Sequence, residues 1–139
     1  MKEIILKFEI KPMAKQSFRT TRSGQKYLDA SVIKYRKAIR NMAILQMRKQ
    51  KAEKIEGAVN MNIVYSFRRP KSLNKKERNE IDSGKSIPKT TKPDIDNLTK
   101  AILDALNGIA WKDDAQVAQI NIQKIWSTKD QIEIEIWEN

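Results

Sequence analysis

Apolar and polar residues alternate in four separate segments of the chain, and this period-two pattern constrains its fold more than any other feature. Successive side chains of a strand lie on opposite faces of a sheet, so each segment predicts a strand with one buried face. Because a short turn around Ser127–Asp130 separates the last two segments, we expect these two to pair as an antiparallel hairpin. The segments are Ile4–Ile10, Val59–Phe67, Val117–Trp126 and Ile132–Ile136.

A second pattern, with apolar residues three and four positions apart, predicts a long helix after the first strand. This spacing is typical of an amphipathic helix of about six turns. We expect the helix to begin at a cap, either Asp29 or Ser31, and to run towards Lys54. Its apolar positions are Leu28, Val32, Tyr35, Ile39 and Met42.

A shorter helix is predicted from Asn97 to Leu106. Asp96 is expected to be its N-cap, because a carboxylate there accepts hydrogen bonds from free backbone N–H groups. Asn107-Gly108 is typical of the end of a helix. The expected apolar face consists of Ile95, Leu98, Ile102, Ala105 and Leu106.

The predicted order of elements is β-α-β-loop-α-β-β. This order indicates an α+β (or α/β) fold in which a mixed sheet packs against two main helices. The chain has 139 residues, which suit a single domain, residues 1–139, with a core of ordinary size.

The charge of the chain indicates a polyanionic partner. Its 28 Lys and Arg residues outnumber 17 Asp and Glu residues, which leaves a formal net charge of +11. Such a charge favours binding to phosphates through counterion release. Chromatin, ribosomal and membrane-surface proteins have the same balance, so charge alone does not identify the partner.

Cysteine and histidine are both absent from the sequence. Their absence excludes disulfides, thiolate zinc sites, a Cys nucleophile and a His general base. Oxygen atoms must therefore hold any metal ion, which favours Mg²⁺, with Mn²⁺ as the other candidate. We predict no membrane association, because no run of 18 apolar residues and no signal peptide is recognisable, and we expect a cytoplasmic protein.

Two basic segments are candidates for contact with nucleic acid. The segment from Lys11 to Lys26 reads as a loop or loose hairpin that turns near Ser23-Gly24. One interpretation is an arm that grips phosphates, with Phe18 as a wedge between bases; the other is a solvated loop with Phe18 on the core. The second segment, Lys71–Lys92, is polar and contributes little to a core. From these segments and their flanks we expect DNA contacts from Lys15, Arg19, Arg22, Arg68, Arg69 and Lys92.

The acidic residues gather around the short helix. Asp94 and Asp96 are two positions apart at its start, so both can reach one ion, and Lys100 follows one turn after Asp96. Asp113-Asp114 follows the helix, and could return beside Asp94 only if the next strand runs alongside the helix. Carboxylates in a basic protein fit a metal-dependent nuclease, in which a metal ion activates water. The alternative interpretation is ordinary: a cap, a surface ion pair and a turn.

The segment D-I-D-N-L-T-K-A-I-L-D-A-L, followed by W-K-D-D-A-Q-V, resembles the signature of the RusA family of Holliday junction resolvases. The resemblance implies a Mg²⁺-dependent endonuclease that acts as a homodimer on four-way DNA junctions. It implies metal ligands at Asp94, Asp96 and Asp114 and a catalytic lysine at Lys100. Further motif positions, which we expect to support the site rather than bind the metal, are Asn97, Asp104 and Asp113.

Two other functions stay open from the sequence. One is a nuclease for other branched DNA, such as flaps or forks. The other is a non-catalytic nucleic-acid-binding protein that uses only its basic surface. The aspartates weigh against this second function, because acids that face a phosphate backbone are unfavourable without a metal. No partner protein is predicted.

Overall fold

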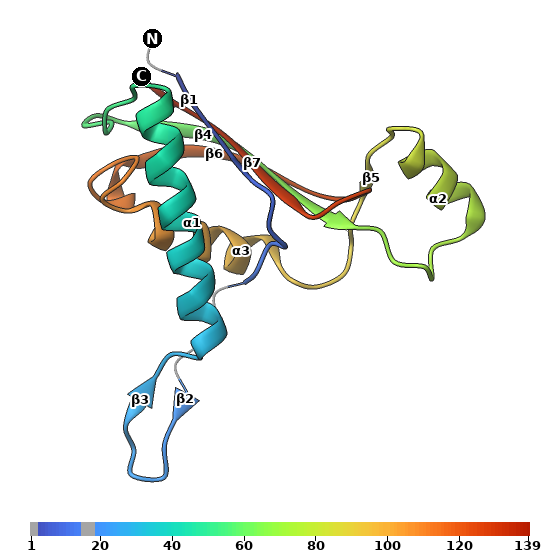
Figure 1. The fold of residues 1–139 in the computed structure, drawn as a ribbon, viewed down its shortest axis with the longest axis horizontal. Helices are drawn as coiled ribbons and strands as arrows, with labels where there is room; N and C mark the ends of the chain where they lie inside the picture. Colours follow the sequence, from blue (N-terminus) through green and yellow to red (C-terminus); the bar gives the residue numbers. More distant parts are fainter. Residues whose placement is uncertain (1–2, 15–18) are drawn as a thin grey trace.

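A five-stranded mixed sheet forms the centre of the protein, with strands in the order β1-β7-β4-β6-β5 (Figure 1). The structure, a computed structural model, describes residues 3–14 and 19–139. Strand β4 pairs parallel with β6, and the other neighbouring strands of this sheet pair antiparallel. The predicted α+β fold with a mixed sheet is thereby confirmed. The strands are β1 (Glu3–Phe8), β4 (Val59–Arg68), β5 (Ile87–Pro88), β6 (Val117–Ser127) and β7 (Gln131–Glu138).

The predicted hairpin of the last two strands is wrong, because β4 lies between β6 and β7. The turn after β6 instead crosses the end of β4. There the backbone N–H of Arg69 donates to the Ser127 carbonyl oxygen over 2.8 Å, and the backbone N–H of Arg68 donates to Asp130 Oδ1 over 2.9 Å. These hydrogen bonds satisfy backbone groups where β4 leaves the sheet, at the point where the chain passes from β6 on one side of β4 to β7 on the other.

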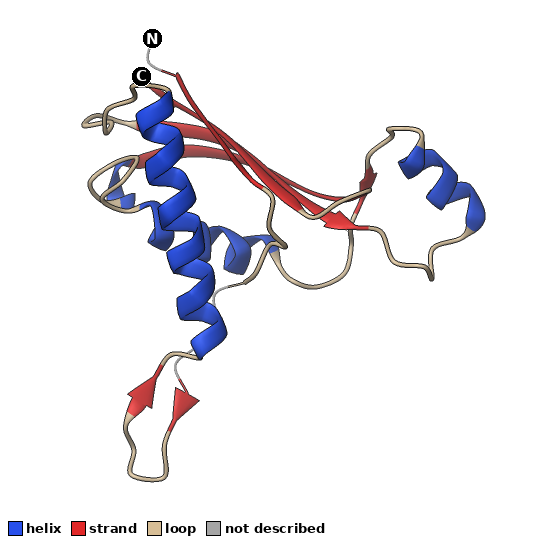
Figure 2. Ribbon diagram, viewed as in Figure 1, coloured by secondary structure: helices blue, strands red, loops and turns tan. Residues whose placement is uncertain are grey.

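Helices α1 (Ala30–Lys49) and α3 (Ile95–Leu106) cover one face of the sheet (Figure 2). The other face carries polar side chains, among them Lys7 and Glu133, whose charged groups are 4.0 Å apart. This arrangement explains the alternation seen in the sequence, because only the helix-covered face is apolar. The core residues include Tyr35, Ile39 and Ala43 of α1, Leu98, Ile102 and Ala105 of α3, and Met61, Ile63, Ile134 and Ile136 of the sheet.

Helix α1 agrees with its predicted periodicity but is shorter than predicted. Asp29 caps it, because its carboxylate accepts a hydrogen bond of 2.9 Å from the backbone N–H of Ser31. Leu28 therefore lies before the helix. The helix ends at Lys49, and Lys51 has a positive φ of 54°, a conformation that does not continue an α-helix.

Gln46 of α1 and Gln50, the C-cap of this helix, cover the free edge of strand β1. Gln46 accepts a hydrogen bond from the backbone N–H of Lys7 over 2.7 Å and donates one to its carbonyl oxygen over 2.8 Å. One turn later, Gln50 does the same with Ile5, at 3.0 and 2.7 Å. Each side-chain amide thus makes the two hydrogen bonds that the backbone of a residue in a neighbouring strand would make. Because unpaired edges attract other chains, this arrangement also protects β1 from edge-to-edge association.

Helix α3 begins two residues earlier than predicted. Asp94 is its N-cap, since the backbone N–H of Leu98 donates to the Asp94 carbonyl oxygen over 3.1 Å, so Asp96 lies within the first turn. Ile95 is 44% exposed and does not belong to the core, in contrast to the rest of the predicted apolar face. At the other end, Asn107 is the C-cap as predicted, and Arg40 of α1 donates to its carbonyl oxygen over 2.8 Å.

Two small units extend from the sheet and its helices (Figure 1). One is the hairpin of β2 (Arg19–Thr20) and β3 (Lys26–Tyr27), whose turn contains Gly24 with φ +84°. This confirms the predicted hairpin. The other is α2 (Lys75–Asp82), which lies within the polar segment Lys71–Lys92. Among residues 3–14 and 19–139, every helix is too short or too polar to span a lipid bilayer.

Candidate metal site and nucleic-acid interface

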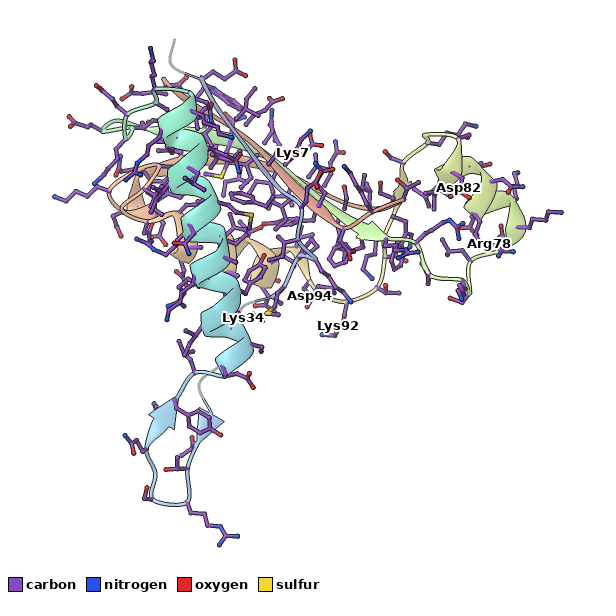
Figure 3. The ribbon with its side chains drawn as sticks, in the orientation of Figure 1. Lys7, Lys34, Arg78, Asp82, Lys92 and Asp94 are labelled. Carbon is purple, nitrogen blue, oxygen red and sulfur yellow. The ribbon has the colours of Figure 1, made fainter. Side chains whose placement is uncertain are left out.

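Asp94 and Asp96 lie on the exposed first turn of α3. The Asp94 side chain is 54% exposed and makes no capping hydrogen bond to the helix. Its Oδ2 is 3.7 Å from Lys92 Nζ, and both side chains project from the loop that enters α3 (Figure 3). Asp96 Oδ1 accepts a hydrogen bond of 2.9 Å from the backbone N–H of Asn97. Two carboxylates with free oxygen atoms therefore share the positive end of a helix dipole.

The remaining predicted residues of α3 follow its helical repeat. Lys100 is exposed and lies one turn after Asp96, so it shares the side of the helix that carries the carboxylate. Asn97 and Asp104 are half-buried. The helix is held in register by its buried face, where Thr99 Oγ1 and the Tyr65 hydroxyl of β4 are 3.0 Å apart. Burial raises the pKa of Tyr65 well above its usual value, so this hydroxyl stays neutral and is available for the hydrogen bond.

Two lysines hold the loop that leads into Asp94. Lys124 of β6 donates from Nζ to the carbonyl oxygens of Thr91, over 2.6 Å, and Pro93, over 2.8 Å. Lys89 donates from Nζ to Thr91 Oγ1. The loop immediately before Asp94 is therefore attached to the central sheet, and the position of the carboxylate depends on these contacts.

A short 3-10 helix, η1 (Asp114–Gln116), precedes β6. Asp114 is its first residue, and Asp113 is the residue before it. Asp113 caps η1 by accepting a hydrogen bond from the backbone N–H of Ala115 over 3.2 Å. Gln116 fixes the whole turn. Its Oε1 accepts from the backbone N–H groups of Lys112 and Asp113, and its Nε2 donates to the Ile55 and Gly57 carbonyl oxygens. Asp114 is half-buried, and its backbone is fixed by these neighbours.

The structure does not bring Asp114 beside Asp94 within one chain. Strand β6 does run back alongside α3, but Asp114 comes before this strand begins, at the C-terminal end of α3. Asp94 lies near Lys124, seven residues along β6 from Val117, which corresponds to roughly 23 Å of strand. Accordingly, the part of the chain that the structure describes holds no group of three acidic side chains that could bind one metal ion.

The basic residues predicted to contact DNA fall into two places. Arg22 lies in the turn of the β2–β3 hairpin and is exposed, as are Arg68 and Lys92. The Arg69 guanidinium donates to both carboxylate oxygens of Asp82 in α2, over 2.8 and 2.9 Å, which lowers the pKa of Asp82. Lys15 lies outside the described residues, as does Phe18, and for Arg19 only the backbone is described.

A basic pocket of about 390 Å³ adjoins the loop before Asp94. Phe67 and Trp126 line it together with Pro93 and Asp130, and Asp130 Oδ1 already accepts a hydrogen bond from the backbone N–H of Arg68. We call it the Lys89 pocket after its most buried cation. The cationic side chains that line it are Lys11, Arg68, Arg69, Lys89 and Lys92.

Sequence reasoning missed three residues that shape these sites: Gln116, Lys124 and Lys89. Gln116 did carry a signal, because it is part of the W-K-D-D-A-Q-V segment, but no local pattern shows that it bonds to the loop at Ile55. Lys124 occupies a strand position where a long polar side chain is unremarkable. Its partners lie some thirty residues away, at Thr91 and Pro93, so only the fold reveals its role.

Comparison with known proteins identifies a family and a relative. The family described as Endodeoxyribonuclease RusA matches residues 8–137, a span that includes both aspartate pairs and Lys100. The protein named "Uncharacterized protein YqaN" of Bacillus subtilis (strain 168) is 38% identical over 86 residues. That alignment covers 60% of this chain and 60% of the relative, so the chain spans about three fifths of the length of the curated relative it matches.

Proposed function

Since the chain belongs to the RusA family of endodeoxyribonucleases, a family of Holliday junction resolvases, we propose that it resolves four-way DNA junctions by paired, symmetric cleavage of phosphodiester bonds. The observation that carries this proposal is the exposed first turn of α3. Asp94 and Asp96 present exposed carboxylates there, and Lys100 lies one helical turn after Asp96. The protein that carries these acids is strongly basic.

The donor atoms fit Mg²⁺, which prefers carboxylate oxygens and retains several water molecules. In this proposal Asp94 and Asp96 hold the ion, and Mn²⁺ is an acceptable substitute. When bound, the ion supplies a Lewis acid and an activated water at neutral pH. Lys100 would place its ammonium group against the scissile phosphate and stabilise the negative charge that develops on it. Lys124 and Lys89 would keep the Asp94 loop in place during the reaction.

The position of Asp114 supports a site shared between two protomers. Within one chain, Asp94 is the N-cap of α3 and Asp114 follows the C-terminal end of this helix, which is about 18 Å long at 1.5 Å per residue for 12 residues. In a two-fold homodimer, Asp114 of the partner subunit would complete the pair formed by Asp94 and Asp96. A two-fold dimer would also present two identical sites to two symmetric strands, as junction resolution requires.

Cleavage of a labelled immobile four-way junction tests the function. The protein is incubated with the junction in Mg²⁺ or in EDTA, and the products are separated under denaturing conditions. We expect paired nicks at symmetric positions in Mg²⁺ alone. The Asp94→Asn variant should bind the junction and leave it intact, and so should Asp114→Asn. Normal cleavage by either variant would refute the site assignment.

Parallel reactions with a flap, a fork and a linear duplex define the substrate. A junction resolvase should cut the four-way junction in preference to all three. Preference for the flap or fork would indicate a nuclease for other branched DNA. Binding that weakens steeply with salt but never leads to Mg²⁺-dependent nicks would indicate a non-catalytic DNA-binding protein.

A further inference from the structure

Lys89 is a buried cation without an acidic partner. It is 8% exposed, and none of the described carboxylates forms an ion pair with it. Its Nζ lies 4.1 Å from the ring centroid of Trp126 and 5.1 Å from that of Phe67. These two aromatic faces attract the ammonium group, but they do not neutralise its charge.

The hydrogen bonds of Lys89 are also incomplete. An ammonium group has three N–H donors, and among the described residues Thr91 Oγ1 accepts one of them. Burial, together with repulsion by Lys124 and Lys11, lowers the pKa of Lys89, so its charged form is less favourable here than that of an exposed lysine. A buried charge is normally paired, because desolvation without compensation is expensive. The surroundings of Lys89 therefore favour an anion.

The Lys89 pocket has room for such an anion and faces the proposed site. Its volume is about 390 Å³, and Lys11, Arg68 and Lys92 are exposed around it. Asp130, the acid in the lining, already uses one carboxylate oxygen for the backbone of Arg68. Pro93 lines the same pocket and directly precedes Asp94. A DNA strand whose scissile phosphate reaches Asp94 would bring neighbouring phosphates close to this pocket.

We propose that the Lys89 pocket binds a backbone phosphate of the strand that is cut, and that Lys89 donates hydrogen bonds to it from the aromatic side of the pocket. This inference rests on the proposed function. It adds a second phosphate contact on the strand that is cut, beside the scissile phosphate. Arg68 and Lys92 lie at the rim of the pocket that makes this contact. The cost of burying an unpaired ammonium group in the free protein is offset when the phosphate binds.

The salt dependence of junction binding tests the inference. Affinity for a labelled four-way junction is measured in EDTA by fluorescence anisotropy, at several salt concentrations, in the Asp94→Asn background. Each phosphate contact contributes about 0.9 to the slope of log K against log salt. Lys89→Met should therefore reduce the slope by about one and weaken binding about tenfold, the scale of one hydrogen bond to a charged group. Lys89→Arg should retain most of the slope.

Lys49→Met is the matched control, because Lys49 is an exposed lysine at the far end of α1. A Lys89→Met slope equal to that of the control would overturn the proposal, even if the variant melts at a different temperature. A slope that falls by about one supports it, whatever the melting temperature. Wild-type cleavage is scored separately, so failure to cut the junction refutes the proposed function, whereas an unchanged slope refutes only the phosphate pocket.

Discussion

Lys124 Nζ donates a hydrogen bond of 2.8 Å to the carbonyl oxygen of Pro93, the residue immediately before Asp94. The same ammonium group bonds to the Thr91 carbonyl oxygen. A strand of the central sheet thus fixes the backbone from which a proposed metal ligand projects. Groups that orient a metal ligand affect metal affinity and activity without touching the metal.

Replacement of Lys124 should therefore impair catalysis. We expect Lys124→Met to lower the cleavage rate by about 10- to 100-fold and to raise the Mg²⁺ concentration needed for half-maximal rate. Titration of junction cleavage with Mg²⁺ measures both quantities. Lys49→Met serves as the control for loss of one positive charge. If Lys124→Met matches that control in rate and Mg²⁺ requirement, the loop does not position Asp94.

Gln116 should be important for stability. Its side chain bonds to Ile55, Gly57, Lys112 and Asp113, and truncation leaves these backbone groups without partners. We expect Gln116→Ala to lower the free energy of unfolding by about 2 kcal/mol, since an unsatisfied, partly buried polar group costs about 1–3 kcal/mol. Urea denaturation measures this. Gln119→Ala, at an exposed position of β6, should change the free energy by less than about 0.5 kcal/mol.

The glutamines that cover the edge of β1 give a second stability prediction. Gln46→Ala and Gln50→Ala each remove a pair of hydrogen bonds to the backbone of β1. Each substitution should cost about 1 kcal/mol, and the double variant should associate at high concentration through the uncovered edge. Denaturation and light scattering measure these effects. Asn41→Ala, a substitution at an exposed position of α1, is the control. If the glutamine variants match this control in free energy of unfolding and in association, the glutamines do not protect the edge of β1.

Lys89 predicts a particular dependence of stability on pH. Its pKa in the folded protein lies below the ordinary value of 10.5. Between these two values the unfolded chain binds more protons at this lysine than the folded protein, so its contribution to stability rises with pH. The free energy of unfolding of wild type relative to Lys89→Met should therefore increase as the pH rises from neutral towards 10.5. Urea denaturation of both proteins at several pH values measures this difference, and a difference that stays constant with pH would contradict a lowered pKa of Lys89.

Sequence periodicity was sufficient to predict individual strands and helices, because it shows which side chains of a segment lie on its buried face. The alternation in Val59–Phe67 predicts β4, and the three-four spacing around Tyr35 and Ile39 predicts α1. The pairing of strands was not predictable in the same way, because alternation indicates which side chains are buried but not which strand lies alongside. The short turn after Ser127 suggested a hairpin, whereas β4 separates β6 from β7.

The candidate site likewise combines residues that the motif identified with contacts that only the fold reveals. The motif identified Asp94, Asp96 and Lys100 together, because their spacing places them on one end of a helix. It also matched Asp114, but a motif does not state where its residues lie in space. That placement depends on the bonds from Gln116 to Ile55 and Gly57, which hold the turn at the opposite end of α3. The roles of Lys124 and Lys89 also depend on long-range contacts, which only the fold establishes.

Mixing two inactive variants tests the central claim most directly. If Asp94 and Asp96 of one protomer act with Asp114 of the partner subunit, a dimer of one Asp94→Asn chain and one Asp114→Asn chain retains one intact site. With random pairing, about half of the dimers in an equal mixture should be of this kind. We predict that co-refolded Asp94→Asn and Asp114→Asn proteins nick a four-way junction in Mg²⁺, although each alone is inactive. A mixture of Asp94→Asn and Asp96→Asn should stay inactive, because no dimer of these chains has an intact site. If the first mixture is as inactive as the second while the wild-type protein cleaves, the shared site is contradicted.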